Sequence, residues 1–202
     1  MRSGRNALIA VVVAAGFAAP AQAGSFELTL LGGFRMGGAF EDSSTAESRR
    51  LDASPSFGLA LGFPLEADRK LEVVWTHQEG RVAGTSTGGG PVDLDLDTLG
   101  IGGTYEWSRG TWRPFVSGTL GFTVISPEQA GFDREALLGG TLGGGVKVPV
   151  SPRVDLRFEG RGALMLATGG ASGVCGGGGC VLTYSGSGMA QFEFLAGLSW
   201  SL

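Results

Sequence analysis

The sequence predicts an all-β fold: an eight-stranded antiparallel transmembrane up-and-down β-barrel. Apolar side chains alternate with polar or small ones along eight separate segments, which is the period of a strand with two different faces. The connections between these segments alternate between short and long. Almost no segment has the 3.6-residue period of a helical face, although 43% of the residues are apolar. A sheet can cross hydrocarbon only as a closed barrel, because an open edge would leave backbone groups unpaired in lipid. A periplasmic β-sandwich is the alternative fold.

The first 23 residues predict a signal peptide. The basic residues Arg2 and Arg5 precede an uncharged apolar run, and an Ala-Gln-Ala sequence follows it as a cleavage signal. The apolar run is shorter than the roughly 20 residues that a membrane-spanning helix needs. We therefore expect export and cleavage, with residues 24–202 forming the barrel domain. An N-terminal anchor that stays attached is the alternative.

Seven segments before the C-terminal one place large apolar residues at every second position. In the last of the seven, for example, Val154, Leu156 and Phe158 alternate with Asp155 and Arg157. Successive side chains of a strand point to opposite faces, so each segment predicts one lipid-facing and one interior face. The predicted strands are Ser25–Phe40, Leu51–Leu65, Leu71–Glu79, Asp93–Trp107, Trp112–Val124, Ala136–Val150 and Val154–Leu166.

The fourth segment is less regular than the others. Leu99, Ile101 and Trp107 share an outward face, but Leu94 and Leu96 occupy the opposite parity. This shift predicts either a bulge or a stretch of strand above the membrane.

The chain ends on an eighth strand whose even positions are apolar. It resembles the terminal strand by which outer-membrane barrels are recognised for assembly, although that strand usually ends in Phe and this one ends in Leu. The resemblance assigns an assembly signal to Phe192, Phe194, Leu198, Trp200 and Leu202.

The connections separate into two classes. The tight ones are Pro64–Lys70, Ser108–Thr111 and Ser151–Arg153. The long, polar or glycine-rich ones are Glu41–Arg50, Gly80–Val92, Ile125–Glu135 and Ala167–Gly188. Short periplasmic turns and longer external loops are typical of outer-membrane barrels, and an even number of strands places both termini in the periplasm.

Several phrases resemble those of small outer-membrane β-barrel domain proteins. They are LDTLGIGGTYEW at 96–107, RPFVSG at 113–118, and CGGGGC at 175–180 followed by QFEF at 191–194. The chain is similar to barrels of the OmpA-transmembrane, OmpX and opacity-protein type, and to uncharacterised members from Gram-negative bacteria. The resemblance implies the fold and a cell outer membrane location, but little about function, because the family contains adhesins, stabilisers and transporters.

The interior faces of the predicted strands carry charged side chains. Burying charges is costly unless they are paired, so we expect an internal salt-bridge network. If the last strand closes on the first, Arg35 lies opposite Glu193. A plugged, rigid core is one interpretation, and a gated ion or proton path along the same charges is the other. The predicted lumen charges are Glu27, Arg35, Asp52, Glu72, Lys147, Asp155, Arg157, Glu159, Arg161 and Glu193.

Cys175 and Cys180 are the only cysteines. The export signal places them in an oxidising compartment, and four glycines separate them, so we expect a disulfide in the last external loop. A metal or redox pair is the alternative, but no histidine is near.

Two polar motifs invite a catalytic or metal-binding interpretation. His77 is the only histidine, and its parity points it at lipid or at the interface. Outer-membrane barrel enzymes that deacylate lipid A carry Ser two positions after such a His, whereas Glu79 stands there in this chain. We therefore expect an interfacial His77 without a catalytic role.

Asp93, Asp95 and Asp97 alternate with apolar residues, as in a strand with three carboxylates on one face. Thr98 occupies the place where a calcium loop needs Gly. A solvated acidic strand extension is the first interpretation, and a weak divalent-cation or lipopolysaccharide-bridging site near the rim is the second.

The composition excludes a nucleic-acid partner, since 15 Lys and Arg stand against 19 Asp and Glu. We expect a non-enzymatic barrel of structural or surface-binding type, without cofactor or metal. Its expected partners are outer-membrane lipid, lipopolysaccharide, the barrel-assembly machinery and periplasmic chaperones. Phe132 and Tyr184 are the main aromatic candidates for an external ligand. The alternatives are a narrow porin-like conduit for small or hydrophobic molecules and a lipid A-modifying enzyme.

Overall fold

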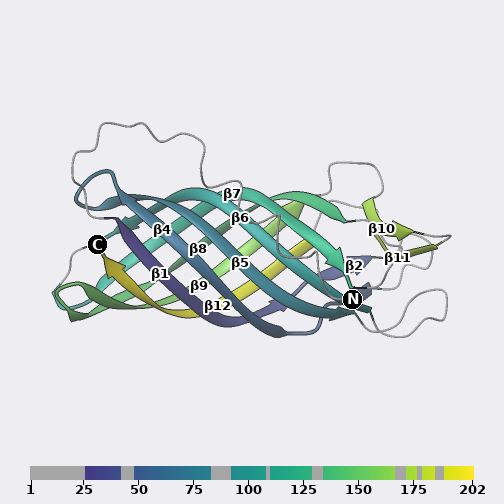
Figure 1. The fold of residues 1–202 in the computed structure, drawn as a ribbon, viewed down its shortest axis with the longest axis horizontal. Helices are drawn as coiled ribbons and strands as arrows, with labels where there is room; N and C mark the ends of the chain where they lie inside the picture. The colour runs from purple at the N-terminus through teal and green to yellow at the C-terminus, as the bar shows by residue number, and fades with distance from the viewer. Residues whose placement is uncertain are drawn as a thin grey trace, which may run out of the picture.

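A computed structural model describes residues 26–41, 48–82, 92–107, 110–128, 134–166, 172–176, 179–184 and 189–202. Eight of its strands close into an antiparallel barrel in the order β1-β12-β9-β8-β7-β6-β5-β4 (Figure 1). These strands are β1 (Glu27–Gly37), β4 (Ser54–Pro64), β5 (Arg69–Val82), β6 (Val92–Glu106), β7 (Arg113–Pro127), β8 (Glu135–Ser151), β9 (Val154–Leu166) and β12 (Met189–Ser201). The predicted up-and-down barrel is therefore confirmed. The predicted signal peptide lies outside the described residues.

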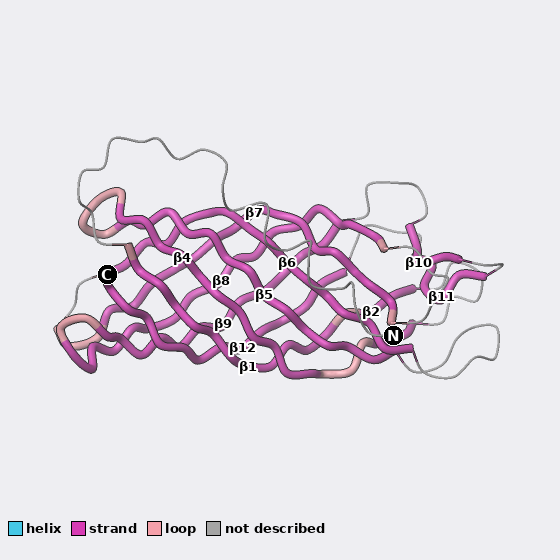
Figure 2. The backbone as a smooth tube through the Cα atoms, viewed as in Figure 1, coloured by secondary structure: helices cyan, strands magenta, loops and turns pink. Residues whose placement is uncertain are grey.

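Two small hairpins accompany the barrel. One pairs β2 (Ala39–Glu41) with β3 (Ser48–Arg50), and the other pairs β10 (Ser172–Gly176) with β11 (Gly179–Tyr184). Strands β2, β10 and β11 lie at the end opposite the C-terminus, which we name the loop end (Figure 1). Short turns lie at the other end, beside the C-terminus, which we name the turn end (Figure 2). Within the described residues, no helix is long and apolar enough to cross a membrane.

The barrel closes through the pairing of its first and last strands. Glu27 lies opposite Ser201 and Arg35 lies opposite Glu193, so the register predicted from the chain ends is confirmed. The Arg35 Nη2 and Glu193 Oε1 atoms are 3.1 Å apart, and both side chains are buried. Pairing of the ends leaves no open edge in this sheet.

The outer wall of the barrel is apolar over a band that fits a bilayer. Asp97 of β6 and Trp107, which directly follows the strand, are ten positions apart, and the outward residues between them are Leu99, Ile101, Gly103 and Tyr105. At about 3.3 Å per residue and a tilt of about 40°, this stretch covers roughly 25 Å, the height of the apolar band of an outer-membrane barrel. The predicted assembly signal contributes Phe192, Phe194, Leu198 and Leu202 to the exposed apolar surface.

The parity shift in β6 does not come from a bulge. β6 pairs with β5 and β7 in unbroken register from Leu94 to Tyr105. Leu94 and Leu96 point inward and are buried, while the aspartates that alternate with them point outward. The second alternative, a stretch of strand above the apolar band, agrees with this arrangement. In the barrel, the register shift falls instead in β8, between Pro149 and Ser151.

The segment before β4 also differs from its prediction. Parity placed Leu51 on lipid and Asp52 in the lumen, whereas Leu51 is buried and Asp52 is exposed. Residues 51–53 do not belong to the regular strand, which begins at Ser54. The Leu51 amide donates to the Gly38 carbonyl oxygen, so local backbone contacts set its orientation. Alternation resumes with Ser54, which points inward as predicted.

Candidate functional site

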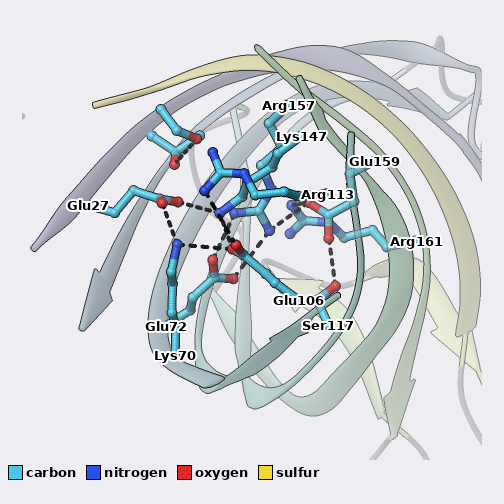
Figure 3. Close-up of polar contacts among 12 residues, drawn as sticks. Glu27, Lys70, Glu72, Glu106, Arg113, Ser117, Lys147, Arg157, Glu159 and Arg161 are labelled. Carbon is cyan, nitrogen blue, oxygen red and sulfur yellow. Dashed lines mark hydrogen bonds and ion pairs between the residues drawn. The ribbon is translucent and has the colours of Figure 1, made fainter. Parts of the chain in front are cut away.

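The charged lumen is the candidate functional site. Strand alternation carries nine of the ten predicted residues into the interior, and only Asp52 lies outside it. Lys70, Glu106 and Arg113 join them (Figure 3). The described network then has six acidic and six basic side chains. Ion pairs divide these twelve residues into two clusters, each with three acidic and three basic members.

The proximal cluster lies near the turn end. Lys147 Nζ, on β8, is 2.5 Å from both Glu27 Oε1 and Glu106 Oε1. Lys70 Nζ contacts the same two residues, at 2.6 Å from Glu27 Oε2 and 3.0 Å from Glu106 Oε1. The four groups form a ring in which cations and carboxylates alternate, so that each charge has two opposite neighbours (Figure 3).

Arg113 completes the proximal cluster at its more exposed edge. Its guanidinium pairs with Asp155 and reaches Glu106 Oε2 at 4.0 Å. Asp155 is buried, while the Arg113 side chain is 30% exposed. The cluster therefore changes from fully buried at Lys147 to partly solvated at Arg113.

The central cluster is built around Arg157. Arg157 Nη1 and Nη2 donate to the two oxygens of Glu72 at 2.7 and 3.2 Å, across the bore from β9 to β5. Arg157 also donates to Glu159, and its guanidinium carbon lies 4.6 Å from the centre of the Phe115 ring. A planar guanidinium suits this combination of a bidentate carboxylate and an aromatic face.

A chain of shared carboxylates extends from Arg157 toward the loop end. Glu159 accepts from Arg157 and from Arg161, and Ser117 donates to it at 2.6 Å. Arg161 Nε lies 3.7 Å from Glu193, which also accepts from Arg35. Arg157, Glu159 and Arg161 thus form a column of alternating charges on β9, which Glu193 of β12 extends into the neighbouring strand.

Neutral polar groups follow the last arginine. Arg35 Nη2 donates to Thr76 at 2.8 Å. Above it, Gln78 donates to Ser54 at 2.7 Å and accepts from Gln191 at 3.5 Å. The interior therefore changes from ion pairs to uncharged hydrogen bonds toward the loop end.

Three members of the network were missed in the sequence. Strand alternation could have identified two of them as inward-facing: Glu106 alternates with the outward Tyr105 and Trp107, and Arg113 follows the outward Trp112. Lys70 lies in a segment predicted as a turn, whereas β5 begins at Arg69. Strand ends are where alternation alone is least informative.

His77 lies on the outer wall, as predicted. Its Nδ1 atom is 2.9 Å from Asp97 Oδ1, and its ring centre lies 5.0 Å from that of Phe57 and 6.2 Å from that of Trp75. The Asp97 contact was not predicted, because it depends on the register between β5 and β6. Glu79, the next residue on this face, is exposed and carries a carboxylate in place of a serine hydroxyl.

The three aspartates of β6 share the outer face with His77. Asp93 accepts from Arg81 Nε at 2.6 Å, and this hydrogen bond holds the pKa of the Asp93 carboxyl below its usual range. Among the residues that the structure describes, no group of three or more His, Cys, Asp or Glu side chains is placed to hold a metal ion. This face is an acidic extension of the strand.

The β10–β11 hairpin carries the two cysteines. Its backbone register places Cys175 directly opposite Cys180. Their side chains and Phe132 lie outside what the structure describes, so the disulfide and the aromatic ligand site stay predictions.

No family model and no curated protein matches the sequence. Solved structures match by fold. The crystal structure of Neisserial surface protein A (NspA) superposes with a TM-score of 0.61 at 16% identity, covering 88% of this chain and 97% of that one. The structure of the outer membrane protein AlkL in lipid bilayers gives a TM-score of 0.53 at 12% identity, covering 93% and 95%. The chain therefore has the fold of the small eight-stranded outer-membrane β-barrels.

Proposed function

We propose that this protein is a non-enzymatic outer-membrane barrel of structural or surface-binding type whose lumen is sealed. The observation that carries the proposal is the pairing of all twelve network charges within two clusters of equal positive and negative charge. The most deeply buried cations of the network are Lys147 in the proximal cluster and Arg157 in the central cluster, with exposed fractions of 0% and 1%.

Physical reasons favour a seal over a pore. Eight strands enclose an interior just wide enough for side chains to fill. An ion crossing this lumen must displace a guanidinium or ammonium group from a buried carboxylate, and an unpaired buried charge is costly. The Arg157–Glu72 pair spans the bore, so no path along the axis avoids it.

A second candidate, a narrow conduit, is favoured by the shared carboxylates. Glu159 serves two arginines, and Arg161 lies between Glu159 and Glu193. An exchange of partners along this chain would let a mobile ion or proton pass while each side chain keeps an oppositely charged neighbour. The conduit is therefore the alternative that the first experiment must test.

Planar-bilayer recording on the purified mature protein tests the proposal. We expect no discrete channels from protein that a heat-shift gel shows to be folded. Channels whose conductance changes on substitution of Arg157 or Glu159 would contradict the seal and support the conduit.

We also propose that Cys175 and Cys180 form a disulfide. The support is their opposite placement in the backbone register and the short Gly-rich connection between them. Thiol titration of denatured protein is expected to find no free thiol before reduction and two after it. Two free thiols before reduction would contradict the disulfide. The bond is expected to stiffen a glycine-rich loop, and its loss to leave the barrel folded.

A further inference from the structure

Seven buried apolar side chains gather inside the barrel at the loop end. Each of them is at most 5% exposed, and the lumen below them holds the charged clusters together with a smaller apolar group, Leu31, Ala60, Val74 and Leu195. Strands β6, β7, β8, β9 and β12 each supply at least one, and one precedes β4. We name this group the apolar septum; its members are Leu51, Leu94, Leu96, Ile125, Leu137, Met165 and Met189.

The register places several septum residues beside one another on neighbouring strands. Leu96 lies opposite Ile125 on β7, and Met165 lies opposite Met189 on β12. Leu137 lies opposite Thr123, one inward position from Ile125. Residues directly opposite each other share a face of the sheet, so these side chains adjoin within the bore.

Leu51 closes the ring where the strands supply only glycine. A Cβ atom on Gly80 of β5 would lie 3.0 Å from Leu51 Cδ1. A Cβ atom on Gly38, after β1, would lie 3.0 Å from Met189 Sδ and 3.4 Å from Leu51 Cβ. The two glycines thus leave the space that Leu51 fills, and its amide is held by Gly38.

On β6 the outer wall beside the septum is polar. Asp93, Asp95 and Asp97 point outward and alternate with the inward leucines of this strand. β6 thus reverses here the pattern of its membrane-spanning part, with apolar residues inside and carboxylates outside. An open channel would need a wettable lining at its mouth, which the septum does not provide.

A small cavity lies between the septum and the charged clusters on the β6–β9 side of the barrel. Its volume is about 20 Å³, and its inward-facing lining includes Thr98, Thr119, Thr123 and Thr141. Thr123 lies one inward position below Ile125, and Thr141 lies one above Gly143, the residue opposite Arg161. The lumen is thus blocked at two levels that differ in chemistry.

We propose that the apolar septum is a second seal, which excludes water and ions independently of the charged clusters. The inference rests on the proposed function, in which the native lumen is closed. An apolar constriction blocks ions by dewetting, without any ion pair to break. Removing the charges alone therefore leaves the barrel closed, and conduction requires that both levels be opened.

Four full-length variants test the second seal in planar bilayers, each with a heat-shift gel to confirm folding. The network variant is Lys147→Ala with Arg157→Ala, and the septum variant is Leu94→Ala with Leu96→Ala. We expect each alone to be silent and their combination to conduct. As a matched control, Leu99→Ala with Ile101→Ala removes outward side chains of the same strand, and it should leave the network variant silent.

The outcomes separate the two proposals. Channels from the native protein would overturn the proposed function. A silent native protein with a conducting network variant would overturn the septum alone. If the protein that carries both the network and the septum substitutions folds but forms no channels, the septum is not the seal that remains when the charges are removed.

A thiol measurement does not depend on disruptive variants. Thr123→Cys, in a Cys175→Ser and Cys180→Ser background, places a thiol in the cavity below the septum. We expect silver ion to react with it on the order of a hundredfold more slowly than with Asp95→Cys on the outer wall, because the buried thiol reacts only during local opening. The septum variant should remove most of the difference. Equal rates with the septum intact would overturn the inference.

Discussion

Replacing Glu72 with alanine is expected to lower the free energy of unfolding by about 3–5 kcal/mol, because the change leaves a buried guanidinium without its bidentate partner. Arg157 is 1% exposed and donates to Glu72 through two nitrogens. Its remaining carboxylate, Glu159, is already shared with Arg161. Denaturant unfolding in micelles, followed by tryptophan fluorescence, measures the loss.

The double variant Glu72→Ala with Arg157→Met is the matched control for this pair. It removes both charges and keeps an apolar chain against the Phe115 ring, so most of the stability should return. Arg81→Ala breaks an ion pair that is exposed at the loop end, and it should change unfolding little. If Glu72→Ala and the native protein unfold at the same denaturant concentration, the Glu72–Arg157 pair does not stabilise the barrel.

Replacing Gly145 with alanine is the second change with a large expected effect. A Cβ atom there would collide with the carbonyl oxygen of Phe158 and would lie 2.7 Å from Phe115 Cζ. The carbonyl belongs to the paired strand and cannot move without disturbing the sheet. Overpacking of this kind typically costs about 1–3 kcal/mol, and we expect the upper part of that range or a failure to close the barrel. Refolding yield on a heat-shift gel and denaturant unfolding are the measurements.

Gly32→Ala provides the matched control, because a Cβ atom on Gly32 meets nothing within 4 Å. It makes the same chemical change on another barrel strand and should fold and unfold as the native protein does. Equal behaviour of the two variants would show that the contacts around Gly145 do not restrict its size.

Alternation predicted most of this fold because a barrel wall has two chemically different sides. The same alternation, with the pairing of the chain ends, predicted that Arg35 faces Glu193. It failed at Asp52, where residues outside the strand take their orientation from backbone contacts with Gly38 and Arg81. It also could not reveal the His77–Asp97 contact, which needs the register of an interior strand pair.

The apolar septum shows a different limit of sequence reasoning. A lipid-facing leucine and a leucine in a buried core are the same letter, so Leu94 and Leu96 read as an irregularity of the outward face. Only the closed sheet shows that these leucines line the interior at the loop end. Leu51 belongs to this interior although it precedes its strand.

The cross-bore ion pairs have a consequence for how the chain enters a membrane. Glu27 and Lys147 are 120 positions apart in sequence, and Glu72 and Arg157 are 85 apart. A half-inserted sheet would expose these charges to hydrocarbon before their partners arrive, at a large cost. Neutralisation therefore coincides with the joining of β1 to β12, which favours concerted insertion of a nearly complete cylinder over the addition of one strand after another.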